Sequence, residues 1–111
     1  MSQKKKMIRE KFRNEVFSRD KYTCVCCGFK SSLAKCREDL DAHHIQDRNL
    51  MPNGGYAAKN GISVCKPCHE LCELYHQGLE CPNEYMPDAL YAKIGTSYDD
   101  AYKACEKLDN D

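Results

Sequence analysis

The chain has 111 residues, enough for a single domain (residues 1–111) but too few for a large apolar core without a disulfide or metal cross-link. It has nine cysteines, no apolar stretch long enough to span a membrane, and no apolar signal-peptide segment after its charged N-terminus. We therefore expect a cytoplasmic protein without a membrane partner. In that compartment cysteines bind metals or lie in the core as thiols rather than forming disulfides.

The charge is balanced overall but unevenly distributed. Residues 1–48 contain 12 Lys or Arg and 7 Asp or Glu, whereas residues 49–111 contain 5 and 10. A basic first half suits a polyanion such as nucleic acid. A dipolar, solvated surface without a partner explains the same pattern, and from charge alone it is the favoured interpretation.

The predicted elements give an α+β fold. Residues 7–19 have apolar side chains at Ile8, Phe12 and Val16, spaced as on one face of a helix, with residues 4–6 as a frayed tail before it. The later elements are expected in this order: a knuckle at 24–28, a loop with a short helix at 30–40, a strand at 40–45, a loop at 47–61, a strand at 62–64, a helix at 68–77, a turn at 81–87, a helix at 88–94 and another from 97 onward.

Two of the later helices have predicted faces. In the helix at 68–77 we expect Leu71, Leu74 and Tyr75 to point inward. The last helix begins at Ser97, with Asp100 at the third position as in a capping box. Its apolar face could pack on the core of the same chain or on a second subunit in a homodimer.

Four cysteines have the spacing of a metal site. Two C-x-x-C pairs, Cys24 with Cys27 and Cys65 with Cys68, are separated by 37 residues. Zinc binds four thiolates in a tetrahedron, and a two-residue gap lets both sulfurs of a knuckle face one point. We predict a structural zinc site; redox C-x-x-C motifs or buried thiols are the alternatives. Cys26 competes with Cys24 or Cys27 as a ligand, but a one-residue gap makes a poorer chelate, so it is left out. The other cysteines have no partner at metal spacing and are expected as core or free thiols: Cys36, Cys72, Cys81 and Cys105.

A histidine doublet lies between the two cysteine pairs. The chain reads DAHHI at 41–45 and NGISVCKPCHE at 60–70, with Asn60 before the second pair and His69 directly after it. The order C-x-x-C, D-x-H-H-I, N-x4-C-x-x-C-H resembles that of the HNH endonucleases, whose ββα-metal core is also called the His-Me finger. The resemblance covers residues 9–77 and leaves residues 78–111 as a C-terminal helical extension.

The resemblance implies a role for each of these residues. His43 would bind a divalent metal, His44 would be the general base, Asn60 would hold the long loop and the base, and His69 would be the second metal ligand. The implied activity is metal-dependent hydrolysis of DNA, with Mg²⁺, Mn²⁺ or Ni²⁺ at the catalytic site. The implied source is an intracellular protein of a bacterium or phage. Family members often have a proline soon after the doublet, where this chain has QDRN.

The residue types suit that chemistry. Histidine is a fitting base because its usual pKa is near neutral, and a loop carbonyl held by Asn60 could set its tautomer. The metal would stabilise charge on the phosphate and the leaving oxygen. In a flat strand, however, His43 and His44 point to opposite faces. Both can line one cleft only if the strand ends or twists there, and we place that end at Gln46.

Further candidates are weaker. His76 and Glu73 could join the metal site, and Asp41 could orient a histidine or bind water; for each, an ordinary surface residue is the alternative. For DNA phosphates the candidates are Arg48 and Lys59 at the loop, with Arg13 and Arg19 on the first helix, and a solvated charge is the alternative for each.

The functional prediction is thus a DNA endonuclease, either nicking one strand or cutting both. Cutting both strands would be easier for a homodimer with one site per strand. Two rival readings stay open, an RNase and a non-catalytic zinc-knuckle module that binds nucleic acid or protein. A non-catalytic zinc-knuckle module would have no functional role for His44 and Asn60.

Overall fold

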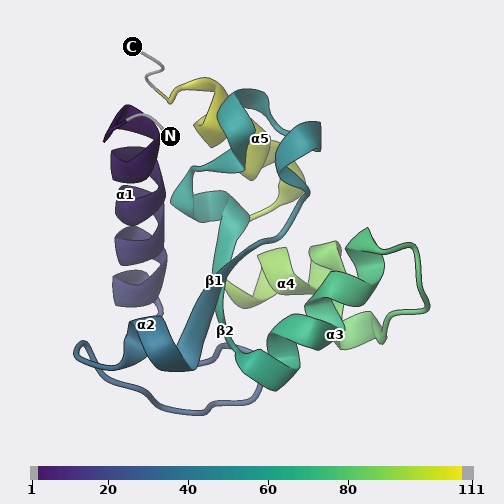
Figure 1. Ribbon diagram of the computed structural model, residues 1–111. Coiled ribbons are helices and arrows are strands. Elements are labelled where there is room, and N and C mark those ends of the chain that lie inside the picture. The colour runs from purple at the N-terminus through teal and green to yellow at the C-terminus, as the bar shows by residue number, and fades with distance from the viewer. Residues whose placement is uncertain (1–2, 109–111) are drawn as a thin grey trace.

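Two antiparallel strands run through the middle of the protein, with helices on either side (Figure 1). The computed structural model describes residues 3–108. Strand β1 (Leu40–His44) pairs with β2 (Gly61–Cys65), so that His44 lies opposite Gly61. Both predicted strands and the α+β class are confirmed. Within residues 3–108 there are five α-helices, and none is long and apolar enough to cross a bilayer.

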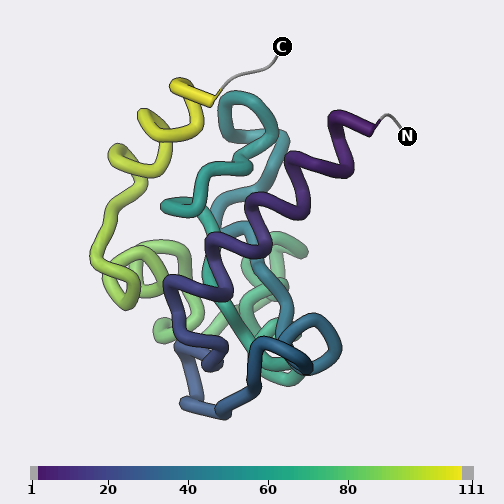
Figure 2. Tube along the Cα trace, turned by 90° about the vertical axis from the view of Figure 1, so that its left-hand side faces the viewer, coloured from purple at the N-terminus to yellow at the C-terminus, as the bar shows by residue number. Residues whose placement is uncertain are grey.

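Helix α1 (Gln3–Arg19) crosses one face of this sheet, as the view from its own side shows (Figure 2). Phe12, Val16 and Phe17 are its buried residues. Gly61 lets the helix approach β2 closely, because a Cβ at that position would lie 2.5 Å from the ring of Phe12. The expected frayed tail at residues 4–6 was wrong: lysine is a good helix former, and these residues extend the helix from Gln3.

The end of α1 is tied to the second strand by side chains. Arg19 donates to the backbone oxygens of Ala58 and Gly61, both at 2.7 Å, and pairs with Asp20 at 2.8 Å. Asp20 in turn accepts from the backbone N–H of Ser63 at 2.8 Å. These contacts give Arg19 a structural role.

The opposite side of the sheet is covered by α3 (Lys66–His76), which follows β2 without a loop (Figure 1). Pro67 stands in its first turn, where its missing N–H costs nothing. The buried residues of α3 are Cys68 and Cys72. The prediction that Tyr75 points inward was wrong, since that side chain is 38% exposed. The helix is rotated so that its cysteines, rather than its tyrosine, face the interior.

The connections are short helical turns. Helix α2 (Cys36–Asp39) precedes β1, as expected. The long loop between the strands contains three 3₁₀ turns: Arg48–Leu50, Pro52–Gly55 and Ala58–Asn60. Another such turn, Asn83–Tyr85, leads into α4 (Pro87–Lys93). All predicted helices are therefore present, with ends that differ by a few residues.

The last helix, α5 (Tyr98–Glu106), packs on the chain's own long loop. Ala101 and Cys105 are its buried residues, and the side-chain amide of Asn53 donates to the backbone oxygen of Cys105 at 2.8 Å. Ser97 caps the helix by accepting from the N–H of Asp100 at 3.1 Å, which confirms the predicted start. Of the two alternatives for this apolar face, the structure shows packing on the same chain.

Candidate functional site

The cysteine cluster consists of Cys24, Cys27, Cys65 and Cys68. Their sulfur atoms all lie within 4.8 Å of one another, and the sulfurs of Cys27 and Cys65 are 3.6 Å apart. Two sulfurs bound to one tetrahedral zinc ion at about 2.3 Å lie about 3.8 Å apart, so the spacing fits zinc. The structure thus confirms that these four residues are positioned to bind a metal ion.

The surroundings of the cysteine cluster favour a bound cation. Burial alone would raise the pKa of Cys24, but N–H groups of Cys27 and Cys65 outweigh it and bring this pKa to about 7. Burial raises the pKa of Cys65 and Cys68. A cation among the four sulfurs would offset the cost of ionising these buried thiols. The thiols of Cys26 and Cys72 form a hydrogen bond, and both residues lie outside the cysteine cluster.

The second group, the histidine–carboxylate cluster, is His43, His69 and Glu73, whose ligand atoms also lie within 4.8 Å of one another. His43 comes from β1, and the other two are one turn apart on α3. Glu73 Oε2 is 3.2 Å from His43 Nδ1 and 3.7 Å from His69 Nε2. Glu73 is only a weak candidate in the sequence, where its signal is a position four residues after His69, on the same helix face.

The surroundings of both histidines in this cluster suit metal binding. His43 is 2% exposed; burial first, and the neighbouring histidines second, lower its pKa to about 3. Asp41 Oδ2 lies 3.0 Å from His69 Nδ1, so this ring nitrogen donates to the carboxylate. His69 Nε2 is then left with its lone pair directed to the cluster. The expectation that Asp41 orients a histidine agrees with this contact.

His44 lies beside the cluster on the other side of the strand end. Its ring stacks on Phe12, with centroids 4.5 Å apart and planes 16° from parallel, and meets the edge of Tyr56 at 5.0 Å. Burial, then the charge of Arg48, lowers its pKa to about 4, so the ring is neutral at neutral pH. His43 and His44 line one cleft of about 250 Å³ at the point where β1 ends. Both histidines can therefore line one cleft because the strand ends beside them, as the sequence analysis required.

Asn60 holds the loop that follows β1. Its amide accepts from the N–H of Gln46 at 3.0 Å and donates to the carbonyls of Gln46 and Gly55 at 3.1 and 3.2 Å. Tyr91, which sequence analysis did not single out, donates its hydroxyl to the same amide oxygen at 2.7 Å. In the part of the chain that the structure describes, Nε2 of His44 is buried without a hydrogen-bond partner. Aromatic packing, rather than a loop carbonyl, positions that ring.

Replacing Asn60 with alanine should lower the free energy of unfolding by about 2–4 kcal/mol, because it leaves buried backbone groups of Gln46 and Gly55 unpaired. Urea denaturation followed by circular dichroism measures the change. The control is Asn49→Ala in the same loop, where the side chain is exposed. Equal, small effects of both substitutions would show that Asn60 does not hold the loop.

Basic residues surround the cleft. Arg48 lines it, with its guanidinium 5.2 Å from the centre of the Tyr56 ring. Arg9 and Arg13 of α1 line an adjoining hollow of about 280 Å³, which shares His44, His69 and Arg48 with the cleft. Lys59, a further sequence candidate, lines neither space and is exposed on a separate turn. His76 lines the cleft, but its Nε2 donates to the backbone oxygen of His44 at 3.2 Å and it does not belong to the histidine–carboxylate cluster.

Comparisons of the chain with known protein families, curated proteins and solved structures find no match. The function therefore has to be inferred from the site. Two nitrogens and a carboxylate can hold a divalent cation and leave positions open for water and substrate. With a neutral imidazole beside them and arginines on the rim, the arrangement suits attack of water on a phosphate ester.

Proposed function

We propose that the protein is a metal-dependent DNA endonuclease of the HNH type, which hydrolyses phosphodiester bonds in one or both strands. Residues 9–77 would be the nuclease core and residues 78–111 its helical extension. The observation that carries this proposal is the histidine–carboxylate cluster in the same cleft as His44. A candidate cation site and a candidate base are thus within reach of one phosphate.

His43, His69 and Glu73 would hold Mg²⁺, Mn²⁺ or Ni²⁺, which supplies charge stabilisation for the phosphate and the leaving 3′ oxygen when bound. His44 accepts a proton from the attacking water, which its neutral ring can do at neutral pH. Asp41 keeps His69 in the tautomer that leaves Nε2 free for the cation. Asn60 supports the loop beside the base through Gln46.

The proposed substrate is a polyanion because cationic groups converge on the cleft. Arg48 and the α1 residues Arg9 and Arg13 line it or the adjoining hollow. Nε of Arg13 is buried and has no hydrogen-bond partner within residues 3–108. Contacts between arginines and phosphates would make binding independent of base sequence and weaker at high salt.

Zinc in the cysteine cluster would position the catalytic helix. Cys65 ends β2, and Cys68 lies in the first turn of α3, directly before His69. Linking these two residues to the knuckle at Cys24 and Cys27 fixes where α3 begins and how it is rotated. A closed four-sulfur site has no open position, so this zinc would be structural.

Removing the carboxylate of the histidine–carboxylate cluster should weaken binding of the catalytic cation without affecting binding of zinc. We expect Glu73→Gln to lower the affinity for Mn²⁺ roughly tenfold or more, because a charged ligand becomes a neutral one. Isothermal titration with Mn²⁺ of the zinc-loaded protein measures this affinity. Glu70→Gln, on the exposed face of the same helix, is the control. Unchanged Mn²⁺ affinity in Glu73→Gln would exclude Glu73 as a ligand.

The nature of the substrate and products tests the reaction class. Labelled DNA and RNA strands of one sequence are incubated with zinc-loaded protein and Mn²⁺, and the product ends are analysed. The proposal predicts cleavage of DNA with 5′-phosphate and 3′-hydroxyl ends. Cleavage of RNA alone would support the RNase reading, and binding without cleavage of either strand would support a zinc-knuckle binding module.

A further inference from the structure

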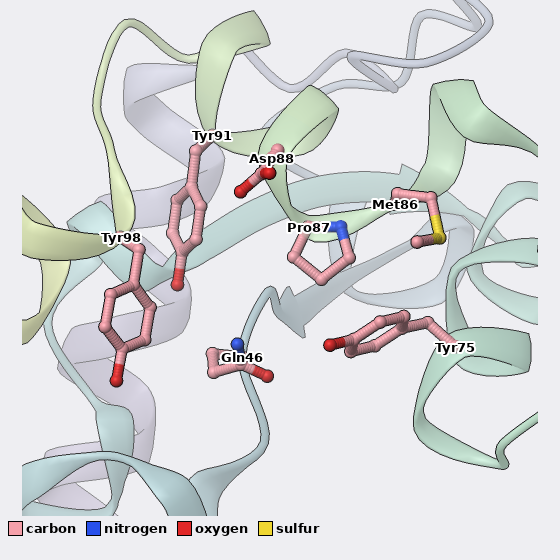
Figure 3. Close-up of a pocket in the computed structure, with 7 residues that line it drawn as sticks. All are labelled: Gln46, Tyr75, Met86, Pro87, Asp88, Tyr91 and Tyr98. Atoms are coloured by element: carbon pink, nitrogen blue, oxygen red, sulfur yellow. The ribbon is translucent and has the colours of Figure 1, made fainter.

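Beside the segments that line the catalytic cleft is a hollow of about 340 Å³, whose lining is shown in Figure 3. Gln46 and Tyr75 line this hollow, whereas the next residues in the chain, Asp47 and His76, line the cleft. The two spaces therefore lie on either side of the same two backbone segments, 46–47 and 75–76. Their closeness lets one strand contact both, with a phosphate in the cleft and a neighbouring base at the hollow.

The walls of the hollow are aromatic. Tyr91 and Tyr98 stand on one side, and Pro87 and Tyr75 lie across from them (Figure 3). Tyr91 is 2% exposed and its hydroxyl donates to Asn60, so this residue forms a fixed wall of the hollow. Tyr75 and Tyr98 are 38% and 39% exposed, and their rings are accessible to a flat partner. Nucleobases stack on aromatic side chains of this kind.

Two polar groups face each other across the hollow. Gln46 lies at one end and the carboxylate of Asp88 at the other (Figure 3). Oε1 of Gln46 is buried without a hydrogen-bond partner among the described residues, so the side-chain amide has an unused acceptor. None of the described residues that line the hollow is lysine or arginine. The Asp88 carboxylate, with no basic side chain beside it in this lining, repels a phosphate group and attracts a ligand that donates a hydrogen bond.

We propose that this hollow binds an unpaired nucleobase with an exocyclic amino group, such as adenine or cytosine, from the strand being cleaved. The base stacks on Tyr98 and Tyr75, its amino group donates to Asp88, and Gln46 bonds another polar atom of its edge. Thymine fits less well because its one base donor, N3–H, lies between two carbonyl oxygens that the carboxylate repels. This inference rests on the proposed nuclease function, and it predicts a preference for single-stranded or locally opened DNA.

Binding of the base is tested by nuclear magnetic resonance titration of the zinc-loaded protein with dAMP, dTMP and deoxyribose 5-phosphate. We expect dAMP to shift the side-chain amide signal of Gln46 and the ring signals of Tyr98. Deoxyribose 5-phosphate, which has no base, should leave them in place, and dTMP should bind more weakly than dAMP. Shifts that are the same for all three compounds would show a phosphate site and overturn the proposal.

Two substitutions test the residues. Tyr98→Ala should weaken binding of a fluorescent oligo(dA) roughly five-fold to a hundred-fold, as for loss of one stacked base. The matched control is Tyr102→Ala: Tyr102 lies one turn further along α5, is 37% exposed, and does not line the hollow. Asp88→Asn, which keeps the shape but removes the charge, should reduce the preference for oligo(dA) over oligo(dT).

Equal binding by the Tyr98→Ala and Tyr102→Ala proteins, or an unchanged base preference in Asp88→Asn, would overturn the base pocket. Cleavage of DNA measured with the same proteins separates this proposal from the nuclease proposal. Base binding without any cleavage would support the pocket and contradict the nuclease. Cleavage by the wild type without base discrimination would support the nuclease and contradict the pocket.

Discussion

Replacing His44 with alanine should reduce DNA cleavage by roughly 10²–10⁴-fold while zinc content and Mn²⁺ binding stay unchanged. The reason is that His44 is the proposed proton acceptor, whereas neither metal cluster includes it. Single-turnover cleavage of a labelled oligonucleotide measures the rate of the chemical step. Zinc content measured on the same sample, with urea denaturation, shows whether the fold is intact.

Loss of the His44 ring also removes its stacking on Phe12, so alanine alone does not separate chemistry from packing. The matched variant is His44→Phe, which keeps a flat ring between Phe12 and Tyr56 but has no nitrogen to accept a proton. We expect both variants to be inactive and His44→Phe to be the more stable of the two. If the His44→Phe protein cleaved DNA nearly as fast as the wild type, His44 would not be the base.

Replacing Cys27 with serine should abolish tight zinc binding and unfold much of the protein. Structural zinc contributes about 10–16 kcal/mol of apparent binding free energy in small domains, which is comparable with a domain's whole stability of about 5–15 kcal/mol. A serine hydroxyl is a poor substitute for the thiolate in this cluster. We expect a fall in Tm of about 15 °C or more, measured by circular dichroism.

The control for this substitution is Cys81→Ser. Cys81 lies outside both metal clusters and donates its S–H to the backbone oxygen of Leu71 at 3.6 Å, a bond that a serine hydroxyl can keep. That variant should retain zinc and the wild-type Tm. If Cys27→Ser also kept both, the cysteine cluster would not be a zinc site.

The parts of the structure that follow from local spacing could be predicted from the sequence. Two C-x-x-C pairs bring their sulfurs together, because a knuckle places both on one side, and the structure has all four in one cluster. The strand that carries His43 and His44 also follows from the alternation of residues 40–45, and the second strand from the short run at 62–64. In each case neighbouring residues determine the outcome.

Other features depend on contacts that no local pattern records. Tyr91 bonds to Asn60 from 31 positions further along the chain, and Phe12 stacks on His44 from a separate helix. Tyr75 was predicted to be buried from its apolar spacing. Cys68, however, belongs to the cysteine cluster, and this position determines which side of α3 faces the core. Tertiary contacts override helical periodicity there.

The most direct test of the account is relaxation of a supercoiled plasmid by purified, zinc-loaded protein, with and without added Mg²⁺ or Mn²⁺. The histidine–carboxylate cluster beside His44 predicts nicking that requires the added cation, and the ratio of open-circular to linear product reports whether one or both strands are cut. Supercoiled plasmid that persists with every cation, in the presence of folded and zinc-loaded protein, would contradict the proposal that this cleft is a nuclease site.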